Sequence, residues 1–286
     1  MSTTDDRSLK GKIAIVTGAS RGIGAGIAER IAAAGAEVIV CARTVDGDPL
    51  KGTATATVER ICTRGGKAHA MALDVTDANS REALIRAVVE RFGRIDILVS
   101  NAGTADYQPT DSMSLAVAEA QIATYFTGPW HLASLVIPVM KRQGEGRILQ
   151  IGSCVISPPE PPYAEYMAWH GHETLYASLK AAVHRFALGL AAELHADNIA
   201  VNVLGPVGAV FTPGLAALGL GVTADMPICE PVEDIAEAAL DMLERPTDYS
   251  GAFELSYNYL DRIGRSSRTL DGRGVARERG ERLADV

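Results

Sequence analysis

Thr17–Gly35, TGASRGIGAGIAERIAAAG, is the stretch that decides the fold, because it sets three glycines between a β-branched run and a helical pattern. The run that leads into it, KIAIVTG, is typical of a buried strand. Gly18, Gly22 and Gly24 follow a Gly-x-x-x-Gly-x-Gly spacing, which differs from the commoner Gly-x-Gly-x-x-Gly form. Such glycines let the backbone turn tightly and approach a pyrophosphate, which the N-terminus of the following helix then stabilises. A plain strand-to-helix turn is the competing interpretation.

Outward from this loop, short runs rich in Ile, Val, Leu and Ala alternate with longer helical patterns. The further strand candidates are 36–42, 67–75, 94–103, 147–153, 198–206 and 252–257, and the clearest later helices are 173–190 and 231–245. Strands that are apolar along their whole length are covered on both faces, as in a parallel sheet with crossover helices. The pattern predicts a single-domain, doubly wound α/β Rossmann fold of about seven strands.

Composition narrows the class of partner. The 286 residues, 47% of them hydrophobic, suffice for one large α/β domain, which we favour over two small ones. A net charge of −8 argues against nucleic acid or an anionic membrane and favours a small molecule. The four cysteines lie far apart without a Cys-x-x-Cys pair, which indicates reduced structural thiols. Because the N-terminus is polar and no long apolar run occurs, we expect a soluble cytoplasmic protein.

Irregular segments interrupt the alternation at 44–53, 157–174 and 205–231. Long loops at the carboxyl ends of strands are where such folds bind ligands. The final stretch, 265–286, mixes arginines with acids and lacks an apolar period, so we expect it to be partly disordered. We therefore predict a domain over 9–257 that includes the loop 205–231, followed by a C-terminal tail over 258–286.

The glycine loop is one of several motifs that occur in the order seen in short-chain dehydrogenases/reductases. The others are LDVTD at 73–77, NAG at 101–103, a serine after a strand at 153, YASLK at 176–180 and NVLGPVGAVFT at 202–212. On these motifs the chain resembles that family from about Leu9 to Tyr257, and within it the NADP(H)-preferring, 3-oxoacyl reductase-like branch. The resemblance implies a nicotinamide dinucleotide cofactor.

In that family the glycine loop cradles the dinucleotide, the Asp-Val pair contacts the adenine, and the Asn-Ala-Gly lines the cofactor and steadies the central strands. The residues so implied to bind it are Gly18, Ser20, Arg21, Gly22, Ile23, Gly24, Arg43, Thr44, Asp74, Val75, Asn101, Ala102, Gly103, Tyr176, Lys180, Val210 and Thr212. Asp74 could equally cap a helix and Asn101 could serve a turn, and both roles are compatible with binding.

Two arginines favour a phosphorylated cofactor. Users of NAD carry an acidic residue about 20 residues beyond the glycine loop, where it binds the adenosine ribose. Here Ala42 stands in that place, followed by Arg43, and Arg21 precedes Gly22. Two guanidinium groups can grip a 2′-phosphate, which a carboxylate would repel. We predict NADP(H), with Thr44 helping and NAD(H) as the less favoured cofactor, unless both arginines are plain surface residues.

Tyr176 stands four residues before Lys180 in a helical pattern, so the phenol and the ammonium share one face. Both could simply reach out to water from an apolar stripe. The resemblance instead makes Tyr176 the acid/base, Lys180 a second ligand of the nicotinamide ribose, and Ser153 the group that orients the substrate oxygen. A phenol has an ordinary pKa of about 10, and a neighbouring ammonium, together with oxidised nicotinamide, would favour its ionised form. Taken alone, Ser153 could also be a strand-end hydroxyl that caps its own backbone.

The chain departs from the family pattern at three places. Tyr125 stands where the family often has an Asn that helps to hold a water linking the lysine to solvent, so the proton relay is in doubt. The interval between Ser153 and Tyr176 is about ten residues longer than usual, and we predict that Pro158–His172 forms part of the substrate entrance. PVGAVFT is one residue longer than the family's version, and Val210 and Thr212 are the candidates for contacting the carboxamide and phosphates.

Other features leave alternatives open. His170 and His172 lack a fixed third ligand, so we expect no metal site, and Tyr163 and Tyr166 are poor candidates for the catalyst. Phe211–Ile228 fits a lid over an apolar ligand or a core helix.

The predicted function is an NADP(H)-dependent oxidoreductase that interconverts a secondary alcohol and a ketone, and the alternative is a dinucleotide-binding sensor or scaffold with weak catalysis. The resemblance implies a homotetramer or homodimer; the substrate and the physiological direction stay open.

Overall fold

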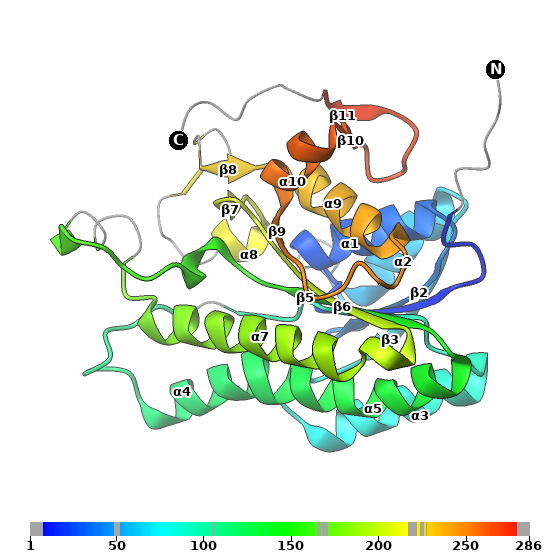
Figure 1. The fold of residues 1–286 in the computed structure, drawn as a ribbon, viewed down its shortest axis with the longest axis horizontal. Helices are drawn as coiled ribbons and strands as arrows, with labels where there is room; N and C mark the ends of the chain where they lie inside the picture. The colour runs from blue at the N-terminus through cyan, green and yellow to red at the C-terminus, as the bar shows by residue number, and fades with distance from the viewer. Residues whose placement is uncertain are drawn as a thin grey trace.

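A seven-stranded parallel sheet forms the centre of the molecule, as predicted (Figure 1). The computed structural model describes residues 8–48, 52–104, 106–164, 167, 171–216, 222–223, 226 and 228–278. The strand order is β3-β2-β1-β4-β5-β6-β9. The strands are β1 (Ile13–Thr17), β2 (Glu37–Ala42), β3 (Lys67–Ala72), β4 (Ile97–Ser100), β5 (Gly146–Ile151), β6 (Ile199–Gly205) and β9 (Phe253–Leu255). The order reverses between β1 and β4, and the crevice at such a point is where these folds bind ligands.

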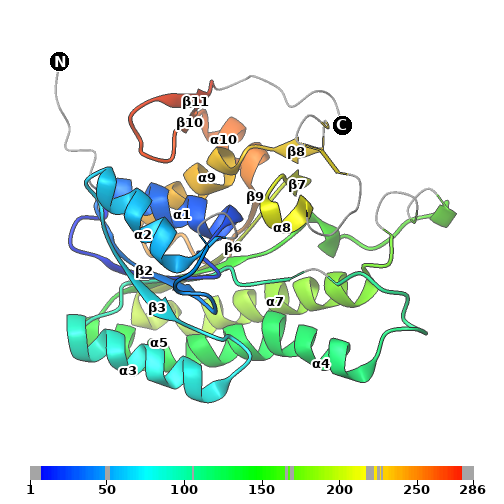
Figure 2. The ribbon, with the colours of Figure 1, turned by 180° about the vertical axis from the view of Figure 1, so that it is seen from behind.

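Helices cover both faces of the sheet (Figures 1 and 2). On one face lie α1 (Gly22–Ala33), α2 (Ala54–Thr63), α9 (Val232–Glu244) and α10 (Ser256–Ile263). On the other lie α3 (Ala78–Phe92), α4 (Leu115–Ile122), α5 (Gly128–Gln143) and α7 (Thr174–Glu193). Alternate strand residues feed two hydrophobic cores, so that Val38 and Val40 pack under α1 whereas Ile39 packs toward α5. The continuous apolar runs follow from this burial on both sides.

Short elements complete the described structure. A π-helical turn, η2 (Ala123–Thr127), joins α4 to α5, and 3₁₀ turns occupy η3 (Cys154–Ile156) and η4 (His195–Asp197). In the loop after β6, the two-residue strands β7 (Ala209–Val210) and β8 (Cys229–Glu230) pair in parallel, and α8 (Pro213–Ala216) lies between them. Part of the predicted lid, Phe211–Ile228, lies outside the described residues, namely 217–221, 224–225 and 227.

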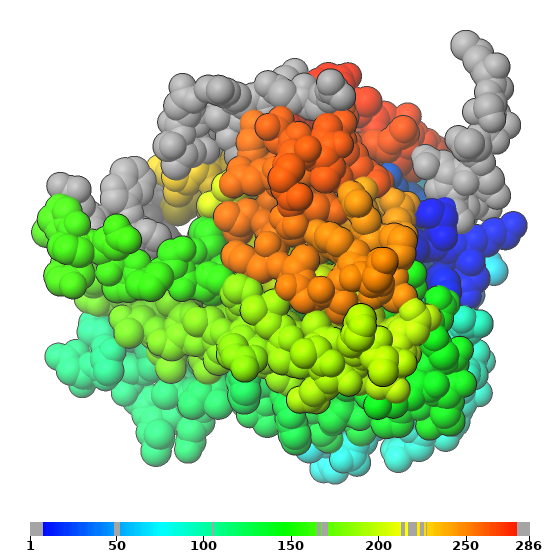
Figure 3. Space-filling model, in the orientation of Figure 1, coloured from blue at the N-terminus to red at the C-terminus, as the bar shows by residue number. Residues whose placement is uncertain are grey.

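The segment 265–278 is folded, contrary to the expected disorder, and its strands β10 (Ser267–Arg268) and β11 (Val275–Arg277) form a hairpin. In Figure 3 the orange and red atoms of this region lie directly against the rest of the domain. Arg277 pairs with the buried Asp234 at 2.8 Å, and Arg265 pairs with the buried Glu237 at 2.7 Å. Because buried carboxylates need a partner, Arg265 and Arg277 belong to the fold. Residues 279–286 lie outside the described part of the chain, and the predicted boundary at 257 falls within α10.

Candidate active site

The glycine loop and the Asn-Ala-Gly motif form one packed unit at the point where the strand order reverses. The Nδ2 of Asn101 donates to the carbonyl oxygens of Thr17 at 2.9 Å and Gly18 at 3.2 Å. A Cβ added to Gly18 would lie 2.7 Å from the Cα of Ala102, and one added to Gly24 would lie 2.3 Å from the Nδ2 of Asn101. The glycines therefore allow the close approach of two backbones, and Asn101 fastens the central strands together rather than only serving a turn.

The start of α1 is suited to a phosphate. Gly18 and Gly22 have positive φ angles of 65° and 60°, which favour glycine. No side chain of a described residue caps the N-terminus of α1, whose N-cap residue is Arg21. Unpaired N–H groups at a helix N-terminus attract an anion. A Cβ on Gly22 would lie 3.2 Å from the Cβ of Thr212, so the loop after β6 reaches this cradle, while the predicted contact of Thr212 with a cofactor stays a prediction. These residues fit a dinucleotide pyrophosphate.

The residues predicted to contact the adenosine half follow the ends of three neighbouring strands: Arg21 follows β1, Arg43 and Thr44 follow β2, and Asp74 and Val75 follow β3. Arg21, Arg43 and Thr44 are exposed. Hydrogen bonds from Thr76 lower the pKa of Asp74, and the positive charge of Arg43 acts in the same direction. Asp74 does not cap α3, because that cap is Asp77, which accepts a hydrogen bond from the backbone N–H of Asn79.

Ser153, Tyr176 and Lys180 come together at the carboxyl end of β5. Ser153 is buried, its hydroxyl accepts a hydrogen bond from the N–H of Val155 at 3.4 Å, and it also hydrogen-bonds Tyr176. The strand-end capping role and the proximity to the phenol are thus both present. Lys180 is only 7% exposed, and its Nζ donates to the carbonyl oxygen of Ile151 at 2.7 Å. It does not reach out to water, so the interpretation as a surface pair is wrong.

Burial dominates the ionisation of this cluster. Desolvation raises the pKa of Tyr176 to about 12, although its hydrogen bond with Ser153 acts in the opposite direction. Desolvation also lowers the pKa of Lys180 to about 8. The expected lowering of the Tyr176 pKa by Lys180 is therefore not found in this structure, because loss of hydration disfavours the charged forms of both groups.

Two further tyrosines flank Tyr176. Tyr107 and Tyr125 each contact it edge to face, with ring centroids 5.4 Å and 5.3 Å away. The hydroxyl of Tyr125 donates to the carbonyl oxygen of Thr104. The sequence identifies Tyr125 as a departure from the family pattern, whereas sequence reasoning did not identify Tyr107 as a residue of the site. Its only signal is a position a few residues after the Asn-Ala-Gly motif, on the loop that leaves β4.

Residues 12–219 match the family model described as short chain dehydrogenase. This chain belongs to the short-chain dehydrogenase family. This membership confirms the predicted family, and the seven-stranded parallel sheet confirms the predicted fold.

Similar proteins include hydroxysteroid dehydrogenases. "Hydroxysteroid dehydrogenase-like protein 2" of Danio rerio is 32% identical over 90% of this chain, which spans 59% of that relative's length. A solved 7α-hydroxysteroid dehydrogenase, in complex with NADH and 7-oxoglycochenodeoxycholic acid, is 31% identical, has a TM-score of 0.74, and is matched over 98% of this chain and 100% of its own. A metagenomic short-chain oxidoreductase in complex with NADP is 26% identical, with a TM-score of 0.70, over 87% of this chain and 97% of its own.

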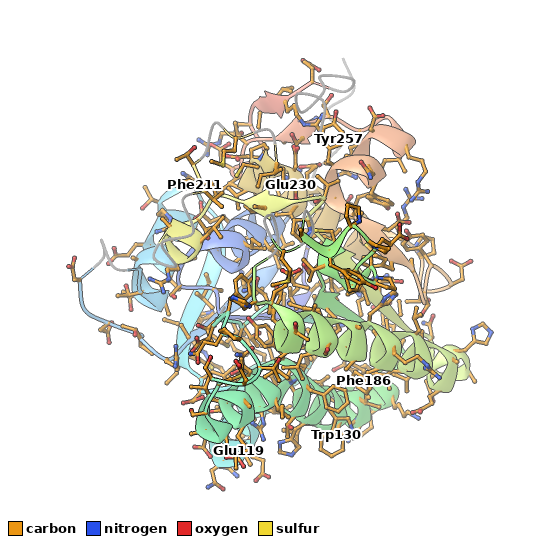
Figure 4. All side chains as sticks on the ribbon, turned by 90° about the vertical axis from the view of Figure 1, so that its left-hand side faces the viewer. Glu119, Trp130, Phe186, Phe211, Glu230 and Tyr257 are labelled. Atoms are coloured by element: carbon orange, nitrogen blue, oxygen red, sulfur yellow. The ribbon has the colours of Figure 1, made fainter. Side chains whose placement is uncertain are left out.

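The structure describes only some of the residues on the two loops predicted to meet the substrate, the loop after β6 and the insertion before Tyr176. The side chain of Val210 is buried in the core, so any contact it makes with a cofactor would run through its backbone. In the insertion, Tyr163 is 61% exposed, whereas Tyr166 and His170 lie outside the described residues. Figure 4 labels Phe211 and Glu230, which belong to the same long segment that follows β6. Within the described part of the chain, no group of three His, Cys, Asp or Glu residues could hold a metal ion. None of the described helices is long and apolar enough to span a membrane.

Proposed function

We propose that this dehydrogenase is an NADP(H)-dependent oxidoreductase that interconverts a secondary alcohol and a ketone. The observation that carries the proposal is the convergence of Ser153, Tyr176 and Lys180 beside a glycine loop that fits a pyrophosphate. A positioned serine and a partly buried phenol near a buried ammonium are groups that a pure binding module does not need. The sensor alternative is therefore the less favoured one.

Ser153, Tyr176 and Lys180 each have a separate role in the transfer of the proton. The nicotinamide group, when bound, supplies or accepts the hydride. In reduction, Tyr176 donates its phenolic proton to the carbonyl oxygen, while the Ser153 hydroxyl orients that oxygen by a hydrogen bond. Lys180 stabilises the resulting phenolate as long as its ammonium is charged. With a pKa of about 12, Tyr176 is the protonated acid at neutral pH, which suits reduction without a prior ionisation. Oxidation requires Tyr176 to lose a proton first.

The preference for NADP(H) rests on Arg21 and Arg43, two exposed guanidinium groups beside the predicted adenosine site, and on Ala42 in place of an acid. Charge-assisted hydrogen bonds to a phosphate contribute about 1.5–3 kcal/mol each. We therefore expect Arg43→Ala to raise the KM for NADPH roughly 10- to 100-fold and to leave that for NADH nearly unchanged. Arg86→Ala, an exposed arginine on α3, is the matched control. Equal use of NADH and NADPH by the wild type would contradict the preference.

An apolar substrate, of the size of a steroid, is the class we propose. Tyr163, Met167, Phe211 and Met226 are large exposed apolar side chains on the loops that follow β5 and β6. Adjacent parallel strands bring such loops to the same edge of the sheet, and exposed apolar groups on both loops there are suited to an apolar ligand. The relatives named for hydroxysteroids support this class, while 3-oxoacyl thioesters, the substrates suggested by the predicted branch, are the next to test.

The test is NADPH consumption over a panel of steroid ketones, 3-oxoacyl thioesters and small ketones. Wild type is run beside Tyr176→Phe, with Tyr249→Phe as control, because Tyr249 lies away from the site and hydrogen-bonds Glu254. We expect turnover by the wild type and the control and a loss of about 10²- to 10⁴-fold in Tyr176→Phe. Binding of NADPH without turnover of any carbonyl or, with NADP⁺, any alcohol would favour the sensor.

We also propose a homodimer or homotetramer. Leu115 and Ile122 on α4 and Trp130 on α5 expose large apolar surfaces, with Trp130 49% exposed. The face of α4 and α5 beside α7 is thus suited to a second copy of the chain. Light scattering of the wild type and of Trp130→Glu measures this directly, and a wild-type monomer at micromolar concentration would contradict it.

A further inference from the structure

Tyr125 lies at the centre of the buried cluster without a role in the chemistry described so far. It belongs to η2 and is 6% exposed. π-helical turns are rare and are often found at functional sites. The edge-to-face contact with Tyr176 has an interplanar angle of 81°, and the Nζ of Lys180 lies 4.9 Å from the centroid of the Tyr125 ring. The tyrosine thus contacts both members of the Tyr-Lys pair.

Lys180 has few groups to stabilise its charge. Its Nζ carries three donors, and the carbonyl oxygen of Ile151 accepts one of them. Among the described residues, no carboxylate pairs with it. The remaining neighbours are the faces of two aromatic rings, Tyr125 at 4.9 Å and Tyr176 at 5.7 Å. A ring face attracts a cation, and more strongly where both are desolvated.

Contacts fix Tyr125 at its hydroxyl and at its ring, and a third contact fixes the end of the π turn that carries it. Its hydroxyl donates to the carbonyl oxygen of Thr104. A Cβ on Gly103 would lie 2.9 Å from the Cε1 of Tyr125, so the Asn-Ala-Gly motif packs directly against the ring. At the end of the π turn, a Cβ on Gly128 would lie 2.5 Å from the carbonyl oxygen of Val75. The ring therefore has one place to lie, between the cofactor loops and α7.

We propose that Tyr125 is a positioning residue, whose ring face holds the Lys180 ammonium and whose contact with Tyr176 fixes the direction of the phenol. The role of Tyr176 and Lys180 in catalysis rests on the proposed function. The hydroxyl of Tyr125 is committed to Thr104, so it is the ring and not the hydroxyl that acts on Lys180. In this chain an aromatic face thereby stands where the family's asparagine would support a solvent link.

The proposal is tested by titrating Lys180 directly. The ε-carbon shift of ¹³C-labelled Lys180 is followed by NMR over pH 6–11 without substrate, with Lys180→Arg for the assignment. We expect Tyr125→Leu to lower the Lys180 pKa by about one unit, because a desolvated cation–π contact of this kind corresponds to roughly that shift. Tyr125→Phe, which keeps the ring, should titrate like the wild type. Tyr107→Leu is the matched control, since Tyr107 contacts Tyr176 at a similar distance and makes no cation–π contact with Lys180 in the described structure.

A second series guards against misfolding of the leucine variant. Phenylalanines with one, two and three ring fluorines at position 125 keep the shape and progressively weaken the attraction of the ring for a cation. A stepwise fall of the Lys180 pKa with fluorine number supports the proposal, and an unchanged pKa overturns it. So does a fall in Tyr125→Phe as large as in Tyr125→Leu. Because these titrations need no turnover, they separate failure of this proposal from failure of the proposed function, which the NADPH assay reports.

Discussion

The buried carboxyl of Glu230 makes the stability of the protein fall with rising pH. Glu230 lies on β8, is 2% exposed, and is hydrogen-bonded by the hydroxyl of Ser256 on α10. The same hydroxyl also lies 3.3 Å from the carbonyl oxygen of Gly205. One hydroxyl proton cannot serve both acceptors, whereas a protonated Glu230 donates to Ser256 and frees that proton for Gly205. The loop after β6 is thus tied to α10 through a neutral carboxylic acid.

The size of the effect follows from the ionisation of Glu230. Burial raises its pKa from 4.5 to about 8, against the smaller effect of Ser256. The folded pKa lies above the unfolded one, so the stabilisation is fully present below pH 4.5 and is lost as pH rises to about 8. Each pKa unit corresponds to about 1.4 kcal/mol. Between pH 6 and 9 the free energy of unfolding should therefore fall by about 3 kcal/mol through this group alone.

Urea unfolding at pH 6, 7, 8 and 9 measures this fall when wild type is compared with Glu230→Gln. The glutamine keeps the shape and cannot ionise, so the difference between the two proteins isolates Glu230 from other titrating groups. Glu233→Gln, on the partly exposed first turn of α9, is the matched control and should follow the wild type. A difference between wild type and Glu230→Gln that stays constant within about 0.5 kcal/mol over this range would refute the reasoning.

Two further substitutions test the cofactor cradle and the C-terminal hairpin. Gly24→Ala places a Cβ 2.3 Å from Asn101, so calorimetry should show NADPH binding weakened by at least tenfold, whereas Gly189→Ala, which meets only the flexible end of an arginine, should bind normally. Arg265→Met leaves two buried acids of α9 short of a partner, so urea unfolding should show a loss of about 3 kcal/mol or more, against less than about 1 kcal/mol for Lys141→Met at a surface pair. Unchanged NADPH binding in the first, or unchanged stability in the second, would contradict these expectations.

The sheet could be predicted because burial on both faces leaves a direct mark on the sequence. Strands such as β1 and β6 are buried along their whole length and, apart from Thr17 and Asn202, consist of apolar residues and glycine, and glycines mark the first turn. The pair β7–β8 could not be predicted, since two residues show no period and the pairing joins positions about 20 apart. The π turn η2 could not be predicted either, because it continues the helical pattern of α4 into α5.

The prediction of partial disorder was wrong for the C-terminal hairpin, and the sequence of α9 contains the reason. Acids at 234, 237, 241 and 244 recur at helical spacing on α9, whose other residues are apolar apart from Glu233. A face of buried acids needs cations from elsewhere, and the arginine-rich segment after 264 supplies Arg265 and Arg277. Considered by itself, that segment has the composition of a disordered tail. Considered with α9, its arginines are the missing partners.

In the candidate active site, the sequence motif gives the position of the residues but not their ionisation. The spacing of Tyr176 and Lys180 locates the pair, but their ionisation depends on how deeply the fold buries them, which no short motif encodes. Burial moves the two pKa values toward opposite charge states, to about 12 for Tyr176 and about 8 for Lys180, so both groups lean toward neutrality. Lys180 can stabilise a phenolate only while its own charge survives near neutral pH. The ring of Tyr125 favours that charge alongside the carbonyl oxygen of Ile151, so Tyr125, Tyr176 and Lys180 act as one electrostatic unit. A relative that keeps the tyrosine and the lysine but changes the ring at this position would match the family equally well and work over a different range of pH.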